Sequence, residues 1–357
     1  MADKALEMGS FRLLATLVLV VSGAELRGEQ YPFRVYDQTA GLANPTVQAI
    51  QSDADGFLWI GTANGLFRFD GTRFRLYDGE MGLPGNRINS MLNTPDGTLW
   101  VATDKGLVRR RPHRPHRPHR DDQDDRFEII DFGKKIMTVP GSLLAWHPTA
   151  GLLFTSSEGL VAISGEAKPH LEWLQPRGAF GTAVDRQSRI WFGCNKAICR
   201  MDDWRQPAKL VKYTEAEGLP AGARWHALLA DRQGRIWARG SEGVARWEPS
   251  RNRFEIIAID AHSSAFAGLH EDRHGRVLLP SEQGLWIYER EAWTLVDSTR
   301  GLPMDTTLSV GEDREGGLWV GTAAAGVARW LGDGNWSTLS KADGLPNPSV
   351  WNMLRDR

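Results

Sequence analysis

Hydrophobic and polar residues alternate over short runs along most of this chain, which is typical of half-buried β-strands. The first complete set of runs comprises residues 47–53, 58–62, 66–69 and 74–77. Gly56 follows an Asp and Gly65 follows an Asn between consecutive runs. Such pairs form tight turns because glycine readily adopts a positive φ. Residues 47–77 are therefore predicted to form four antiparallel strands.

This set of runs recurs at a period of about 41 residues. Copies of the segment DGFLWIGTANGL (55–66) are found at 96–107, 149–160, 187–198, 233–244, 274–285 and 315–327, of which 149–160 is degenerate. The tryptophan position is filled by Trp59, Trp100, Leu153, Trp191, Trp237, Leu278 and Trp319. Six residues earlier, aspartate occurs at Asp53, Asp185, Asp231, Asp272 and Asp313.

Seven copies of a four-stranded unit predict an all-β fold. A single four-stranded sheet cannot cover its own faces, so neighbouring copies must stack on one another. Four strands per copy and seven copies favour a seven-bladed β-propeller over residues 33–331. In such a fold we expect the recurrent tryptophan to pack between blades and the aspartate to cap the turn that follows it.

The two ends of the repeat array predict how the ring closes. Residues 33–47 match residues 74–88, so 33–36 is an outermost strand with no blade before it. It can complete the seventh blade, whose other strands lie between Leu308 and Trp330. Residues 332–357 read as the start of an eighth repeat. Either the chain is truncated there or an eighth blade borrows strands.

Two further segments depart from the repeat. An apolar run at 13–21 ends in small residues and predicts a signal peptide over residues 1–24, hence a periplasmic or secreted protein. The alternative is an ordinary buried strand or helix. The second blade is longer by an insert at 109–125 that contains three Pro-His-Arg triplets and then acidic residues. Proline denies a strand its donors, so we expect a disordered loop, with weak metal binding by its histidines as the alternative.

Charge and cysteine content exclude several classes of protein. The formal net charge is −1, which argues against a nucleic-acid partner bound through a general basic face. Two cysteines cannot form a disulfide scaffold, and no zinc-module spacing occurs. No cofactor or resident metal ion is expected.

The repeats resemble the two-component regulator propeller repeat, whose pattern runs from Gly-Leu-Pro through Asp-Gly and Leu-Trp-Ile-Gly-Thr to Gly-Leu. The Gly-Leu-Pro element begins at Gly82, Gly218, Gly301 and Gly344. The resemblance implies a periplasmic sensor domain of a hybrid histidine kinase that binds a glycan fragment or similar small nutrient. It also implies a second propeller or a kinase portion as a partner. These residues contain no phosphoacceptor-histidine segment and no ATP-binding glycine boxes, so kinase activity is not assigned to them.

Candidate binding residues come from the loops that are expected to share one face of the ring. The hairpins between second and third strands offer Asn64, Lys105, Glu158, Lys196, Glu242 and Gln283, and the loops before the innermost strands offer Arg87, Arg224, Trp225 and Asp305. These positions vary in sign and size, as recognition surfaces do, although unconstrained loops vary in the same way. Trp225 beside Arg224 could hold a sugar or a carboxylate. The alternative for Trp225 is that it fills a crevice between blades.

Catalysis has little support in the sequence. No nucleophile elbow, zinc-binding helix or phosphate loop occurs. His226 and His270 fall in innermost strands, where we expect packed or channel-lining side chains. Lyases that act on cyclic peptide antibiotics also use seven-bladed propellers, so a lyase remains an alternative, as does a scaffold for protein partners. A homodimer is possible.

Cys194 and Cys199 flank one predicted hairpin. Residues five apart across a tight turn can come within disulfide distance, and an oxidising compartment would allow the bond. The alternative is that Cys194 occupies a Thr or Ser position of the repeat and that Cys199 is a core residue.

Overall fold

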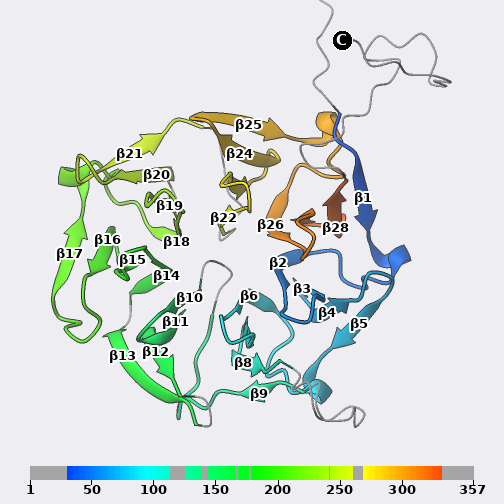
Figure 1. The fold of residues 1–357 in the computed structure, drawn as a ribbon, viewed down its shortest axis with the longest axis horizontal. Coiled ribbons are helices and arrows are strands. Elements are labelled where there is room, and N and C mark those ends of the chain that lie inside the picture. Colours follow the sequence, from blue (N-terminus) through cyan, green and yellow to red (C-terminus); the bar gives the residue numbers. More distant parts are fainter. Residues whose placement is uncertain are drawn as a thin grey trace, which may run out of the picture.

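The computed structural model describes residues 30–112, 126–138, 141, 143–165, 168–176, 178–240, 242–259 and 268–331. Seven four-stranded antiparallel sheets are arranged around a central axis (Figure 1). The predicted seven-bladed β-propeller is confirmed. The predicted signal peptide (1–24), most of the insert (113–125) and the further repeat (332–357) lie outside the described residues.

Blades 1 to 4 follow one another along the chain, each built from its innermost to its outermost strand. Blade 1 contains β2 (Val47–Ser52), β3 (Leu58–Thr62), β4 (Gly65–Phe69) and β5 (Phe74–Tyr77). Blade 2 contains β6 (Ile88–Asn93), β7 (Leu99–Thr103), β8 (Gly106–Arg110) and β9 (Glu128–Ile129). Blade 3 contains β10 (Leu144–His147), β11 (Gly151–Ser156), β12 (Gly159–Ser164) and β13 (His170–Pro176). Blade 4 contains β14 (Ala179–Val184), β15 (Ile190–Cys194), β16 (Ala197–Met201) and β17 (Leu210–Tyr213).

Blades 5 and 6 continue this order, and blade 7 joins the two ends of the array. Blade 5 contains β18 (Trp225–Ala230), β19 (Ile236–Gly240), β20 (Gly243–Glu248) and β21 (Arg253–Ile257). Blade 6 contains β22 (His270–Glu271), β23 (Val277–Pro280), β24 (Leu285–Glu289) and β25 (Ala292–Val296). Blade 7 contains β26 (Thr307–Glu312), β27 (Leu318–Thr322), β28 (Val327–Trp330) and β1 (Phe33–Tyr36).

The ring closes through blade 7. Strand β1 pairs antiparallel with β28, with Phe33 opposite Trp330 and Tyr36 opposite Val327. The closing strand predicted at 33–36 is therefore confirmed. Because β1, the first strand of the described residues, completes the sheet of the last blade, opening the ring here requires this sheet to separate.

Four short 3-10 helices lead from one blade to the next, and each is ended by a Gly-Leu element that is followed by proline in three cases and by Ala43 in the other. These are η1 (Gln38–Ala40), η2 (Gly79–Met81), η3 (Glu215–Glu217) and η4 (Ser298–Arg300). Each ends in a glycine with positive φ, for example Gly82 at 94°. The leucine that follows is buried in every case, as at Leu83. The motif thus ends the helical turn and anchors the loop in the core.

The recurrent aspartate and tryptophan form one hydrogen-bonded unit. Oδ1 of Asp53 accepts the backbone N–H of Phe57 at 2.9 Å, and Oδ2 accepts Nε1 of Trp59 at 2.7 Å. The same indole bond joins Asp185 to Trp191, Asp231 to Trp237 and Asp313 to Trp319. Turn capping by the aspartate and packing by the tryptophan were expected. The bond between them was not, and it satisfies an indole N–H inside the core.

One boundary of the predicted insert was wrong. Arg109 and Arg110 belong to strand β8, because Arg109 pairs in register with Glu128 and binds its carboxylate at 2.8 Å. Arg110 is buried and lies 3.4 Å from Asp53 of blade 1. The strand therefore continues two residues into the segment assigned to the loop.

Within the described part of the chain, no helix has both the length and the apolar character needed to cross a bilayer.

Candidate functional site

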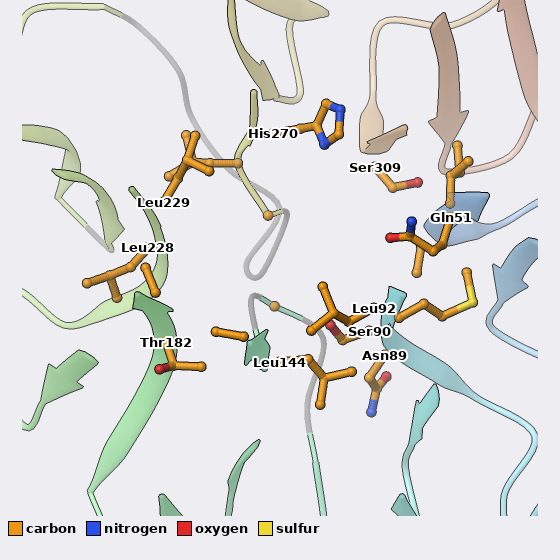
Figure 2. A pocket seen from close by; sticks show the side chains of 18 of the residues that line it. Gln51, Asn89, Ser90, Leu92, Leu144, Thr182, Leu228, Leu229, His270 and Ser309 are labelled. Atoms are coloured by element: carbon orange, nitrogen blue, oxygen red, sulfur yellow. The ribbon is translucent and has the colours of Figure 1, made fainter. Parts of the chain in front are cut away.

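A channel runs along the axis of the ring and is the candidate binding site (Figure 2). It has a volume of about 340 Å³ and is lined by residues from the innermost strands of several blades and from the segments just before them. Each innermost strand pairs with only one neighbour, so its other edge is available to offer backbone N–H and C=O groups toward the axis. The channel can therefore hydrogen-bond a ligand before any side chain is considered.

The described wall of the channel carries no Asp, Glu, Lys or Arg side chain. Its polar residues are Gln48, Gln51, Asn89, Ser90, Thr182, His270 and Ser309. Aliphatic residues fill much of the rest, and Figure 2 shows Leu228 and Leu229 on one side of the channel and His270, Ser309 and Gln51 on another. A wall without these four residue types favours an uncharged ligand, because a buried ion needs a counter-ion close by.

His270 is the one titratable side chain in this described wall. Its Nε2 lies 3.6 Å from Oε2 of Glu312, which belongs to the next blade. Glu312 also accepts the backbone N–H of Arg273, at 3.0 Å for Oε2. Burial raises the pKa of Glu312, but the neighbouring His270 and the hydrogen bond from the backbone of Arg273 outweigh burial and lower it overall. Glu312 thus places a carboxylate beside the His270 ring, at a distance longer than a hydrogen bond.

The two sets of loops predicted to share one face do lie together. The backbone N–H of Asp104 donates to the carbonyl of Arg87 at 2.9 Å, which ties the β7–β8 hairpin to the loop before β6. In the same way Gly65 N–H donates to Asn86. We call this the loop face. The opposite face, with the aspartate turns, is the turn face.

The predicted binding residues differ in exposure and contacts. Asn64, Arg87, Lys105, Lys196, Arg224 and Glu242 are exposed, and Glu158, Gln283 and Asp305 are half-buried. Arg87 touches the channel wall directly, since its Nε donates to Oε1 of Gln48 at 3.3 Å. Glu158 instead pairs with Lys134 at 3.3 Å, and Asp305 accepts the backbone N–H of Ser298 at 2.7 Å.

Trp225 does not form an exposed platform. It is 0% exposed and packs with Trp191, Tyr213 and Trp247 in the core between blades 4 and 5. The crevice-filling alternative therefore describes it, because the neighbouring blade covers the ring. The exposed aromatic residues of the innermost strands are Phe180 and Trp146. Trp146 lines the channel and was missed, although its position holds Ser52 in blade 1.

Blade 5 contains a second pair of interacting residues, Arg239 and His226, which the sequence did not predict. Arg239 occupies the position of Gly61 in blade 1, is buried, and donates to the carbonyl of Pro280 in blade 6. Burial lowers its pKa to about 10. Burial, and then the charge of Arg239, lower the pKa of His226 to about 4. The sequence did contain a signal for this pair, because Arg239 is a charged residue at a position where blade 1 has glycine.

Cys194 and Cys199 are joined by a disulfide, with their Cα atoms 5.7 Å apart. The bond spans the β15–β16 hairpin on the loop face and so constrains the loop that carries Lys196. Among the described residues, no three or more His, Cys, Asp and Glu side chains group as a metal site.

Comparison with known families supports the sequence resemblance. The family described as two component regulator propeller matches residues 41–64 and 82–105. These segments contain the two inner strands of blade 1 and of blade 2, with the loops before them. Two copies of the repeat in this chain therefore match the model of that family. No curated protein is similar in sequence at a significant level.

Solved structures share the fold of this chain. The extracellular domain of a protein named as a hybrid two component system from B. thetaiotaomicron has a TM-score of 0.67 at 16% identity. The match covers 84% of the present chain and 42% of that domain, so the chain spans less than half of its length. Streptogramin B lyase matches at a TM-score of 0.63 and 12% identity, over 84% of this chain and 97% of the lyase. At such identities the likeness shows the fold only.

Proposed function

We propose that this chain is the exported ligand-sensing propeller of a two-component signalling system and that it binds a small uncharged ligand, such as a glycan fragment, in its channel. The observation that carries the proposal is the wall of the channel, which has hydrogen-bonding groups but no Asp, Glu, Lys or Arg among its described residues. The regulator repeat supports the signalling role.

A neutral glycan suits this channel for chemical reasons. Sugar hydroxyls are donors and acceptors at once, so they can pair with strand edges, amides and hydroxyls alike. Gln48, Gln51 and Ser90 are partly exposed in the wall and offer those groups without charge. On the loop face, Arg87 reaches Gln48 in the wall and extends the binding surface toward the other exposed residues there, Asn64 and Lys105.

The signalling partners and the location follow from the same proposal. A binding propeller needs a second propeller or a kinase portion to convert occupancy into a signal, and a homodimer would serve the same end. Export to the periplasm or the cell exterior agrees with the disulfide between Cys194 and Cys199, since such bonds persist in oxidising compartments.

Calorimetric titration of the full chain with cellohexaose, xylohexaose and maltohexaose tests the proposal. We expect saturable binding of at least one sugar without change to the sugar in mass spectra. Arg87→Ala should weaken binding several-fold, and Arg34→Ala, an exposed arginine of the outermost strand β1, should leave it unchanged. The proposal would be contradicted if none of the three sugars bound, or if the two variants had equal effects.

A lyase is the second candidate, and the His270–Glu312 pair favours it. A histidine in a channel wall with a carboxylate nearby can remove a proton from a bound substrate. Incubation with streptogramin B, followed by mass spectrometry, would show the opened product if the chain has this activity. His270→Ala should then abolish it.

A further inference from the structure

Trp146 differs from the other tryptophans of the innermost and second strands. The repeat tryptophans, such as Trp59 and Trp191, are buried and bonded to aspartates. Trp146 is 37% exposed and lines the channel near the end of β10, on the turn face. Exposing a large apolar ring loses burial free energy, so an exposed tryptophan in a channel wall is a candidate contact for a ligand.

The strand end that carries Trp146 is held in place by the next residue. His147 is buried, and its Nε2 lies 2.9 Å from the carbonyl of Ser188 in blade 4. Its Nδ1 accepts the backbone N–H of Ala150 at 2.9 Å. Successive side chains of a strand point to opposite sides, so fixing His147 also fixes the direction of Trp146. The indole is thus a preorganised surface.

The wall around Trp146 is apolar over three consecutive blades. At the same position of the repeat, blades 4 and 5 carry Val184 and Ala230, which also line the channel. Across the channel, His270 of blade 6 and Gln51 of blade 1 supply polar groups. The channel at this end therefore has one apolar arc and one hydrogen-bonding arc.

We propose that Trp146, with Val184 and Ala230, forms a stacking subsite for a pyranose ring at the turn-face end of the channel. A pyranose has the matching chemistry: its C–H face packs on an aromatic ring, and its hydroxyls bond to polar groups such as the Gln51 amide. The inference rests on the proposed function and adds a site at the mouth opposite to the loop face.

The test compares Trp146→Ala with Trp204→Ala in calorimetric titrations with the same three hexasaccharides. Trp204 lies outside the channel in the loop after β16, where its Nε1 donates to Thr149 at 3.0 Å. Trp146→Ala should raise the Kd about tenfold, which is the scale of losing one aromatic contact and the area it buries. Trp204→Ala should leave the Kd within about twofold of the wild-type value.

Fluorescence provides a second readout that does not require the alanine variant to fold. Sugar binding should change the tryptophan emission of the wild-type chain. Trp146→Phe keeps a ring, so it should still bind, but the emission change should be lost.

The outcomes separate the two proposals. Wild-type binding with an unchanged Kd in Trp146→Ala, or an unchanged emission response in Trp146→Phe, overturns the subsite and leaves the proposed function standing. Failure of the wild-type chain to bind any of the sugars overturns both.

Discussion

In blades 4 to 6 the residue after the turn aspartate is an arginine that donates from Nη1 to a main-chain carbonyl of the following blade. Arg186 reaches Arg232 at 3.0 Å, Arg232 reaches Arg273 at 2.9 Å, and Arg273 reaches Glu315 at 2.7 Å. Blades 1 to 3 carry Ala54, Pro95 and Pro148 at this position. There, Arg110 contacts Asp53 and His147 contacts Ser188 across the blade interfaces.

We call blades 4 to 6 the regular half of the ring and blades 1 to 3 the irregular half. In the regular half a repeated Asp-Arg pair encodes the same contact at each interface. In the irregular half each interface uses a different side chain, and this half also carries Trp146 in the channel wall. Because the repeat is less regular in these blades, residues that line the channel there can differ from those of the other copies.

Substitution at the position of the turn aspartate should have the largest effect on stability. The effect should be larger in the regular half, where the residue is an aspartate, than in blade 2, where it is a threonine. Asp231 accepts four bonds, from the backbone N–H groups of Gln233 and Arg235 and from the side chains of Arg235 and Trp237. Asp231→Ala leaves a buried indole and a guanidinium without their carboxylate and should lower the free energy of unfolding by about 3–5 kcal/mol. In blade 2 the position is Thr94, and Thr94→Ala should cost about 1–2 kcal/mol. Urea unfolding of both variants measures the difference, and equal losses would contradict it.

The pH dependence of stability should reflect buried histidines, with His226 of the regular half dominant. Its pKa is about 4 in the folded chain, against 6.5 as the ordinary value, because burial and Arg239 disfavour the charged form. Between pH 6.5 and 4 the unfolded chain binds a proton that the folded chain does not bind. The free energy of unfolding should therefore fall as pH decreases through this window, by up to roughly 3 kcal/mol from this group.

His226→Gln should flatten that slope in urea titrations between pH 7 and 4. Burial also lowers the pKa of His147 in the irregular half, so His147→Gln should flatten the slope as well, but by less. A larger change from His147→Gln would reverse the proposed ranking.

Removing the disulfide should have an intermediate effect. The Cys194–Cys199 bond closes a short hairpin in blade 4, and a loop of this size corresponds to about 2 kcal/mol of chain entropy in the unfolded state. Cys194→Ser with Cys199→Ser should lower the midpoint of thermal unfolding accordingly. Dithiothreitol should destabilise the wild-type chain and leave the double variant unaffected. Equal sensitivity of both would show that the bond is not the cause.

The arginine contact between blades should have the smallest effect. Arg232 is 59% exposed, so Arg232→Ala should cost about 1 kcal/mol or less. Arg251→Ala, at an exposed position of the same blade, serves as the control and should be neutral in urea unfolding. A loss above that of the disulfide variant would mean that the contact organises the regular half more strongly than its exposure suggests.

Part of the candidate site could be predicted and part could not. Arg87 was placed on the correct face because the repeat assigns each loop to an end of its strand, and it does contact Gln48 in the wall. The sequence did not show which of Trp225 and Trp146 is buried and which is exposed. Each lies in an innermost strand, and only the neighbouring blade decides that the first is covered and the second is exposed.

The sequence by itself determined the number of blades, the closing strand at 33–36 and the turn aspartates, because these follow from local periodicity and from repetition along the chain. The tertiary structure decided which side chains face the axis and which pairs meet between blades, such as His270 with Glu312. Those contacts join residues from different repeats. Their distances depend on how the sheets stack around the axis, which no single copy of the repeat specifies.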